Sequence, residues 1–205
     1  MISLKGDSCL ICIATVYLFI VSNASFAFSQ GTPSAEIILS NPLKSSNRSP
    51  IQDLLAVPTA KSGHLLKIGQ SQFEVQVDIA NNFTNSFIGE ESIRLDGERA
   101  TVTLRWQQAI NNKWQLGAEL PWIYDSGGCF DSFIQDWHKL WGLPNADREF
   151  TKNNLLNYYY RSQSDSTSSV DSKSRGSGIG DLRLQLARSL WRHSDRVLSL
   201  HGQIK

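Results

Sequence analysis

The sequence has no excess of charge of either sign and no apolar run long enough to form a membrane-spanning helix. It carries 20 Lys and Arg against 19 Asp and Glu, a formal net charge of +1 over 205 residues. A near-neutral chain has no basic surface for phosphates, so nucleic acid is not an expected partner. Hydrophobic residues make up 40% and charged residues 19% of the chain. This composition is charge-poor for a soluble domain and too polar for a helical membrane protein.

Cysteine is also scarce. Two of the three cysteines, Cys9 and Cys12, lie in an apolar run of 13 residues that follows Lys5 and precedes the small residues of 23–27. This arrangement is typical of a cleaved secretory signal, predicted over residues 1–27. A retained anchor is disfavoured, because a helix needs about 20 residues to cross a bilayer. The mature chain would keep Cys129 alone, which excludes an internal disulfide.

Residues 28–62 are rich in Ser and Asn and contain four prolines. Proline lacks an amide donor and biases the preceding residue away from helix. We therefore expect an arm or plug segment over residues 28–62. It would precede a single β domain over residues 63–205, since this length gives no reason to expect several domains.

Apolar and polar residues alternate with a period of two in five segments of this domain. The segments are residues 72–79, 99–107, 113–124, 182–187 and 198–204. Such alternation places apolar side chains on one face of a strand and polar side chains on the other. The sequence therefore predicts an all-β fold with antiparallel strands.

Alternation alone is more often found in a soluble β-sandwich, but three features favour a transmembrane-type barrel. The two longest runs, residues 99–107 and 113–124, last 9 and 12 residues, close to the ~9–11 residues that a tilted strand needs to cross a bilayer. Tight turns at residues 111–112 and 193–195 contrast with a long loop over residues 125–178, an asymmetry typical of outer-membrane barrels. Aromatic residues also lie near strand ends, where lipid headgroups would be: Trp106, Trp114, Trp122 and Tyr124.

The number of strands is too small for a closed barrel. The five segments become six or seven if residues 92–95 and 154–160 join, whereas the smallest bacterial barrels use about 8 strands. An open sheet edge cannot face hydrocarbon, because its unpaired backbone groups would be unsatisfied. We therefore expect a partial, truncated barrel, or one that closes by oligomerising.

One short amphipathic helix is predicted within the long loop. Apolar residues at three- and four-residue spacing define its stripe: Phe130, Phe133, Ile134, Trp137, Leu140 and Trp141. Asp131 is expected to cap its start, and Gly142 with Pro144 to end it. Phe133, Ile134, Trp137 and Trp141 would lie at the outer leaflet or fold over the barrel mouth as a lid. Residues 162–177, rich in serine, are expected to form a loop tip.

Asp131, Gln135 and His138 are spaced four and three apart on this helix, so a carboxylate, an amide and an imidazole would share one face. Such a group could act as a base or as metal ligands. A capping Asp131 and a His138 bonded to the loop or to Asp136 explain the same residues without catalysis, and this explanation is favoured. No catalytic residue, metal site or cofactor is therefore expected. Asp131 and His138 are the residues to consider if chemistry does occur here.

Charged side chains on the polar side of the strands would line a lumen of mixed charge. The candidates are Glu74, Asp78, Arg99, Arg105, Glu119 and Arg183. Such residues either select solutes or brace the interior through ion pairs, and the sequence leaves both roles open.

Several short motifs follow one another from residue 41 to the end of the chain. They are Asn41-Pro42-Leu43 to Ser49-Pro50, Leu95-Asp96-Gly97-Glu98, Glu119-Leu120-Pro121, Gly127-Gly128 with Asp131, Trp137-His138, Gly142-Leu143-Pro144 with Arg148, and Gly178-Ile179-Gly180-Asp181-Leu182. In this ordered series the chain resembles a family of proteobacterial proteins, a domain of unknown function regarded as outer-membrane-barrel-like. Members of that family are usually longer. The resemblance implies a barrel in the outer membrane and carries no activity.

The sequence thus predicts an outer-membrane β-barrel protein that gives passive passage or uptake to a small molecule. Its expected partners are outer-membrane lipid, a small-molecule solute and the barrel-assembly machinery. A barrel-embedded enzyme that acts on lipid through His138 is one alternative, and a soluble secreted β-sheet binding module is another.

Overall fold

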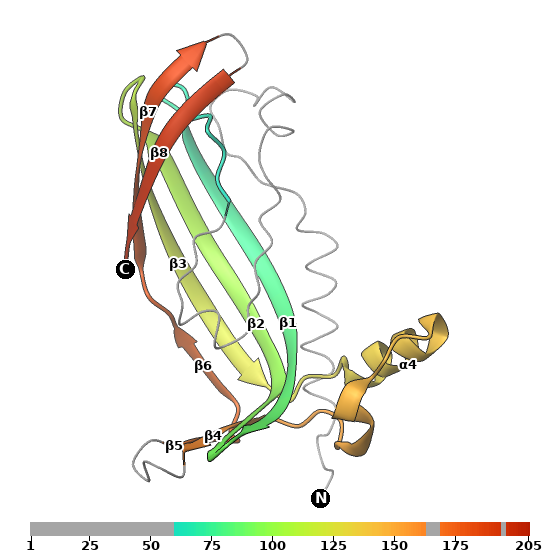
Figure 1. Cartoon of the computed structure of the whole chain (residues 1–205). Helices are drawn as coiled ribbons and strands as arrows, with labels where there is room; N and C mark the ends of the chain where they lie inside the picture. Colours follow the sequence, from blue (N-terminus) through green and yellow to red (C-terminus); the bar gives the residue numbers. More distant parts are fainter. Residues whose placement is uncertain (1–59, 163–168, 194–195) are drawn as a thin grey trace, which may run out of the picture. The chain divides into compact units, whose positions relative to one another are not determined.

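The computed structural model describes residues 60–162, 169–193 and 196–205 (Figure 1). These residues form the strands β1 (Ser71–Ile88), β2 (Glu91–Ala109), β3 (Trp114–Ser126), β4 (Asn157–Ser162), β5 (Ser169–Ser172), β6 (Gly176–Ile179), β7 (Arg183–His193) and β8 (Arg196–Ile204), the helix α4 (Asp131–Trp141) and the 3-10 helix η1 (Ala146–Phe150). The predicted signal peptide, and the predicted arm up to residue 59, lie outside the described residues. No helix in the described ranges combines the length and the apolar character needed to cross a bilayer.

The strands belong to one sheet of mostly antiparallel pairs. They follow the order β5-β4-β2-β3-β7-β8, while β1 pairs with β2 and β6 pairs with β3. The predicted antiparallel, strand-dominated fold is confirmed. Closure into a barrel is not observed, because among the described residues β1 and β8 are not paired with each other.

The alternating segments coincide with β1, β2, β3, β7 and β8, each of which is longer than its segment at one end or both. β1 continues past residue 79 to Ile88, and β2 begins at Glu91, so residues 92–95 are the start of β2. Residues 92–95 were a possible strand in the sequence analysis, whereas residues 80–88 of β1 have no strict period of two and were not predicted. The turn at residues 111–112 is as predicted, and the side-chain oxygen of Asn111 accepts hydrogen bonds from the Lys113 and Trp114 amides.

The described residues divide into two compact units, and β1, β2 and β3 contribute to both. Unit 1 holds residues 78–100 and 123–178, with α4, β4 and β5. Unit 2 holds residues 60–77, 101–122 and 179–205, with β7 and β8.

Unit 1 has a small apolar core in which Leu95, Leu156 and Tyr158 are buried and Ile93 is packed against them. Leu95 and Tyr158 are partners in the antiparallel register of β2 and β4. Residues 125–178 were predicted as a long loop with one helix, and residues 154–160 as a possible further strand. This region contains β4, which overlaps residues 154–160, and also β5 and most of β6. The prediction of a loop tip over residues 162–177 is wrong in part, because β5 pairs with β4.

In unit 2 the polar side of the alternation is buried and the apolar side is exposed. On β2, Arg105 is 7% exposed, whereas its neighbours Leu104 and Trp106 are 41% and 39% exposed. The same pattern holds for buried Thr101, Thr103, Gln115, Glu119 and Gln185 and for exposed Leu116, Leu120, Leu184 and Leu186. Val77, which is buried, departs from it. A soluble sheet normally packs its apolar face inward, so this arrangement is inverted.

Candidate functional site

Four of the six predicted lumen residues meet on the polar face of unit 2. Arg105 on β2 donates hydrogen bonds to Glu119 on β3, at 2.7 Å, and to Glu74 on β1, at 2.6 Å. Arg183 on β7 lies 3.9 Å from Glu119. The buried side-chain amide of Gln185, also on β7, donates to Glu119. We call Glu74, Arg105, Glu119, Arg183 and Gln185 the strand cluster.

The strand cluster joins four strands through buried charges. The side chains of Arg105 and Glu119 are 8% and 6% exposed. An ionised group that is removed from water is stable only when it has opposite charge and hydrogen-bond partners around it. Arg105 meets this condition with two carboxylates, so the cluster can brace the polar face. Gln185 was not among the sequence candidates, although it occupies the same polar phase of the alternation.

The other two lumen candidates, Asp78 and Arg99, belong to unit 1. Arg99 donates to both carboxylate oxygens of Asp125, at 2.8 and 3.0 Å. Asp78 is half-buried on β1. These two residues are therefore not members of the strand cluster.

A second group of buried charges lies in unit 1, where β2 approaches the start of α4. The Glu98 carboxylate accepts hydrogen bonds from the backbone amides of Cys129, at 3.1 Å, and Phe130, at 2.6 Å. The side-chain amide of Asn81 also donates to Glu98, at 3.1 Å. A single carboxylate of β2 thus satisfies two amides of the loop that leads into the helix.

Asp131 is the first residue of α4, and its side chain does not cap the helix as predicted. No side chain caps this helix, whose N-cap residue is Phe130, so the predicted Asp131 cap is wrong. The Asp131 carboxylate instead pairs with Arg148 of η1 and accepts a hydrogen bond from the Asn154 amide at 2.8 Å. A buried guanidinium competes successfully for this carboxylate. We call Asp96, Glu98, Asp131 and Arg148 the loop cluster.

Gly127 and Gly128 allow the loop before α4 to lie close to Glu98 and Asn154. Gly128 has a φ of 67°, and a Cβ there would lie 1.9 Å from the carboxyl carbon of Glu98. A Cβ at Gly127 would lie 2.1 Å from the carbonyl oxygen of Asn154. Neither position has space for a side chain, and the positive φ at Gly128 favours glycine in addition.

The loop cluster holds more negative than positive charge. Asp96 is 1% exposed, and burial raises its pKa from 3.8 to about 6. The Arg148 guanidinium, 3.9 Å away, opposes this rise of the pKa, whereas Asp131 adds to it. Burial also raises the pKa of Glu98, although the hydrogen bonds from Phe130, Asn81 and Cys129 act in the opposite direction. Asp96 is therefore the carboxylate least well compensated by its surroundings.

The loop cluster brings together residues from three of the motifs on which the family resemblance rests: Asp96 and Glu98, Gly128 with Asp131, and Arg148. Residues 16–205 match the family model described as "Protein of unknown function (DUF3187)". The chain belongs to this family. Searches of the curated proteins and of the solved structures found no similar chain. Membership in DUF3187 thus covers every described residue and brings no activity with it.

In this DUF3187 chain Asp131, Gln135 and His138, which the sequence places on one helix face, each contact a different residue. The Gln135 side chain donates to Asn153 at 2.9 Å, and Nδ1 of His138 lies 2.9 Å from the side-chain oxygen of Asn145. His138 is thus bonded to the loop, as the alternative without catalysis required. In the described part of the chain, no three His, Cys, Asp or Glu residues are placed to hold a metal ion.

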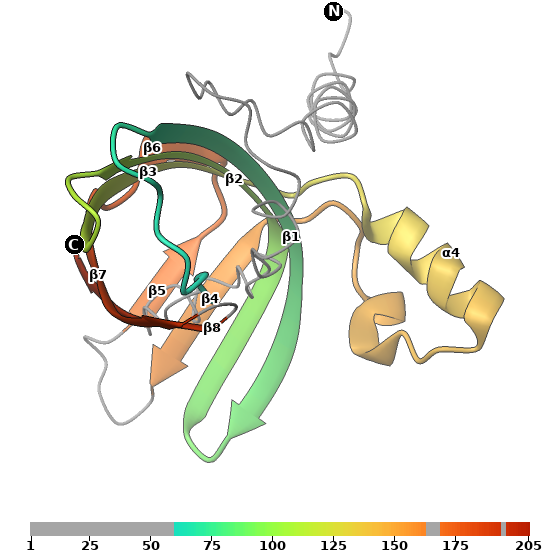
Figure 2. The ribbon, with the colours of Figure 1, turned by 90° about the horizontal axis from the view of Figure 1, so that it is seen from above.

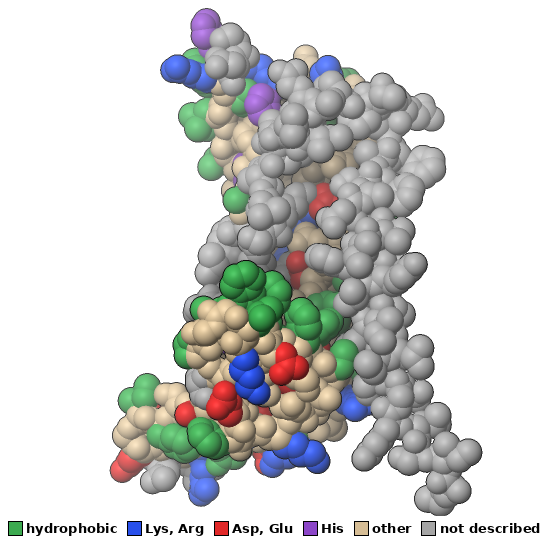
Figure 3. Space-filling view, turned by 90° about the vertical axis from the view of Figure 1, so that its right-hand side faces the viewer, with side chains coloured by type: hydrophobic (Ala, Val, Ile, Leu, Met, Phe, Trp, Pro, Cys, Tyr) green, Lys and Arg blue, Asp and Glu red, His purple; other side chains and the backbone are tan. Residues whose placement is uncertain are grey.

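The helix α4 presents its aromatic side outward. Phe133, Trp137 and Trp141 are 63%, 49% and 63% exposed, and hydrophobic side chains are visible on the surface of this region (Figure 3). Their rings follow one another with centroids 6.3 and 5.7 Å apart. Ile134, on the flank of this stripe, is half-buried. The helix ends at Gly142, in the left-handed conformation, as predicted.

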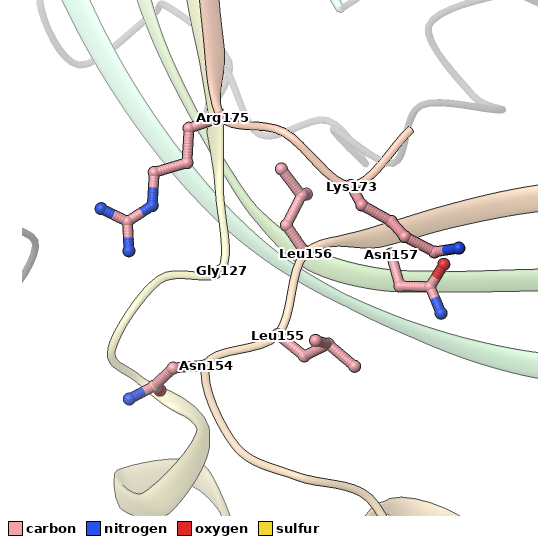
Figure 4. Close-up of a pocket in the computed structure, with 7 residues that line it drawn as sticks. All are labelled: Gly127, Asn154, Leu155, Leu156, Asn157, Lys173 and Arg175. Atoms are coloured by element: carbon pink, nitrogen blue, oxygen red, sulfur yellow. The ribbon is translucent and has the colours of Figure 1, made fainter. Parts of the chain in front are cut away.

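A cavity of about 290 Å³ also lies in unit 1, and it contains none of the candidate residues. Its lining residues are Gly127, Asn154, Leu155, Leu156, Asn157, Lys173 and Arg175 (Figure 4). The Lys173 and Arg175 side chains point in different directions (Figure 4), and Lys173 pairs with Asp171 at 2.9 Å. The lining therefore offers no converging pair of groups for chemistry.

Proposed function

We propose that this chain contributes strands to an outer-membrane β-barrel through which a small polar molecule passes. The inverted alternation of unit 2 carries this proposal. Leu104 and Leu184 are 41% and 48% exposed, whereas Arg105 is 7% exposed. A strand between lipid and a wet lumen needs this distribution, because its apolar side replaces water with hydrocarbon and its polar side does not.

The same distribution of exposed apolar and buried polar side chains would be unfavourable for a soluble sheet. Exposed leucines on β2, β3 and β7 would form a contiguous apolar surface in water, since β3 lies between the other two strands. Large apolar patches of this kind mark contacts with lipid or protein. Trp106 and Trp122, 39% and 44% exposed, suit the lipid headgroup region. These features favour the membrane over the soluble binding module.

The proposed setting requires partners for the sheet edges. An unpaired backbone group in hydrocarbon costs several kcal/mol, so β1 and β8 would need further strands beside them. A second copy of the chain, or strands beyond the described sheet, would supply these partners.

Passage is proposed rather than catalysis because the residues suited to chemistry are engaged separately. Asp131 pairs with Arg148, and His138 is bonded to Asn145. A histidine base is commonly oriented by a carboxylate, whereas His138 is bonded to the amide oxygen of Asn145.

Lysine substitutions on the exposed leucines test the membrane assignment. Leu104→Lys and Leu184→Lys should each destabilise the protein in liposomes by roughly 2–4 kcal/mol if these side chains face the bilayer midplane. In water the same changes at exposed positions should alter stability by less than about 0.5 kcal/mol. Gln108→Lys, at an exposed polar position on β2, is the matched control. Urea unfolding from liposomes, followed by heat-modifiable gel mobility, measures the difference, and equal stability of all three variants would reject the membrane assignment.

Liposome swelling tests passage itself. Purified full chain in liposomes should admit arabinose and raise the KCl conductance of planar bilayers. Folded, inserted protein that admits neither probe would remove passage from the proposal while leaving the membrane assignment to the lysine test.

A further inference from the structure

The first described residues, 60–70, do not continue β1 but cross the polar face of unit 2. The carbonyl oxygen of Gln70 accepts a hydrogen bond from the Ala109 amide at 3.1 Å, at the end of β2. Residues 67–70, which precede β1, form a turn. In it the Gln70 amide donates to the carbonyl of Lys67 at 3.0 Å, and Gly69 has a φ of 77°. This turn directs the chain away from the edge of β2. We call residues 60–70 the crossing segment.

The middle of the crossing segment is bonded to β3. The backbone amide of Leu66 donates to the side-chain oxygen of Gln115 at 2.8 Å, and Gln115 is 6% exposed. Nζ of Lys61 lies 3.9 Å from Oε1 of Glu119, a member of the strand cluster. The segment thus contacts the polar side of β3 and not the exposed leucines on its other side.

The start of the segment is bonded to β8. Nζ of Lys61 donates to the side-chain oxygen of Gln203 at 3.5 Å. A Cβ on Gly63 would lie 3.2 Å from the Val197 carbonyl oxygen and 3.8 Å from Oγ of Ser199. Figure 2 shows the segment leaving the end of β1 and passing to the side of the sheet on which β8 lies.

We propose that the crossing segment is a built-in strap that restricts passage along the polar face of unit 2 and opens when its bonds to β3 and β8 are released. The inference rests on the proposed passage function. Polar contacts hold the segment, and every described residue in it is half-buried or exposed. Segments with few buried apolar contacts open at a lower free energy than the strands they cover. The strap can therefore release while the sheet stays folded.

Leu66→Pro tests release, because proline has no amide hydrogen to donate to Gln115. We expect the KCl conductance of planar bilayers containing the full chain to rise by about twofold or more. Ile68→Pro is the matched control. Ile68 precedes Gly69 in the turn, at a position where a type II turn accepts proline, and it is 57% exposed, so its conductance should equal that of the wild type.

A disulfide tests closure independently of any effect of proline on folding. Gly63→Cys with Ser199→Cys, in a chain whose three native cysteines are replaced by serine, places two thiols where the segment meets β8. Diamide should link them and lower the conductance by about half or more, and dithiothreitol should restore it. Each single-cysteine variant should not respond to diamide.

The outcomes separate this proposal from the one on which it rests. Wild-type passage that neither Leu66→Pro nor the oxidised pair alters would overturn the strap and leave passage intact. Wild type and all variants that are folded, inserted and impermeable would overturn passage and the strap together.

Discussion

The strand cluster and the loop cluster bury comparable charges by different means. In the strand cluster one guanidinium, Arg105, stands between two carboxylates, and all members project from regular strands. In the loop cluster Arg148 contacts two carboxylates, Asp96 and Asp131, and backbone amides are the partners of Glu98. The first arrangement needs only correct strand register, whereas the second needs a loop of exact shape. Stability in unit 2 should therefore depend on charge, and stability in unit 1 on backbone geometry.

Arg105→Met tests the charge dependence and should have the largest effect. Removal of the cation leaves Glu74 and Glu119 buried without it, which should lower the free energy of unfolding by roughly 3–5 kcal/mol. Urea unfolding measures the loss. Arg192→Met, at an exposed position on β7, is the control and should change stability little. Glu74→Gln and Glu119→Gln combined with Arg105→Met should recover part of the loss, and the absence of any recovery would contradict the charge argument.

Gly128→Ala tests the geometric dependence. Its Cβ would meet the Glu98 carboxylate at 1.9 Å, and positive φ costs a non-glycine residue about 1–2 kcal/mol. Displacement of Glu98 orphans the Cys129 and Phe130 amides, at about 1–3 kcal/mol each. Hydrogen exchange of the α4 amides should accelerate accordingly, with strands β7 and β8 unchanged.

Gly142→Ala is the matched control for this prediction. Gly142 has a φ of 65°, close to the 67° of Gly128, but a Cβ there meets nothing within 4 Å. It should therefore show the cost of positive φ alone. Equal acceleration in both variants would mean that the contact with Glu98 contributes nothing.

Asp96→Asn should stabilise unit 1 at neutral pH. Burial raises the Asp96 pKa from 3.8 to about 6, so the folded chain binds a proton more readily than the unfolded chain. Its contribution is then favourable below pH 3.8 and is lost as the pH rises through about 6. The rise corresponds to at most about 3 kcal/mol above pH 7. Asparagine removes the ionised form, so the unfolding midpoints of the variant should lose this pH dependence. If unit 1 of the wild type gained stability relative to the variant between pH 4 and 7, the assignment would be contradicted.

The sequence predicted the strand cluster better than the loop cluster for a physical reason. A period of two fixes the face on which Arg105 and Glu119 lie, whatever the rest of the fold does. Their pairing then follows from antiparallel neighbours. The Gln185 contact was missed, because alternation identifies a face and not a partner across it.

The loop cluster could not be assembled from local signals. Glu98 and Phe130 are 32 residues apart, and nothing in either segment indicates the other. Asp131 has the residue type of a helix cap, but it is the first residue of α4 and the buried Arg148 binds its carboxylate. Local preferences yield to such tertiary contacts. The Gly127-Gly128 pair was the available signal, since adjacent glycines indicate that backbone approaches something closely.

Cys129 lies half-buried at the edge of the loop cluster, and its own amide is one of the two held by Glu98. It is the one cysteine in the described part of the chain. A thiol-specific reagent should therefore react faster when this loop detaches from β2 and exposes the rest of the side chain. The rate of Cys129 modification thus reports on motions at the start of α4, and no engineered label is needed.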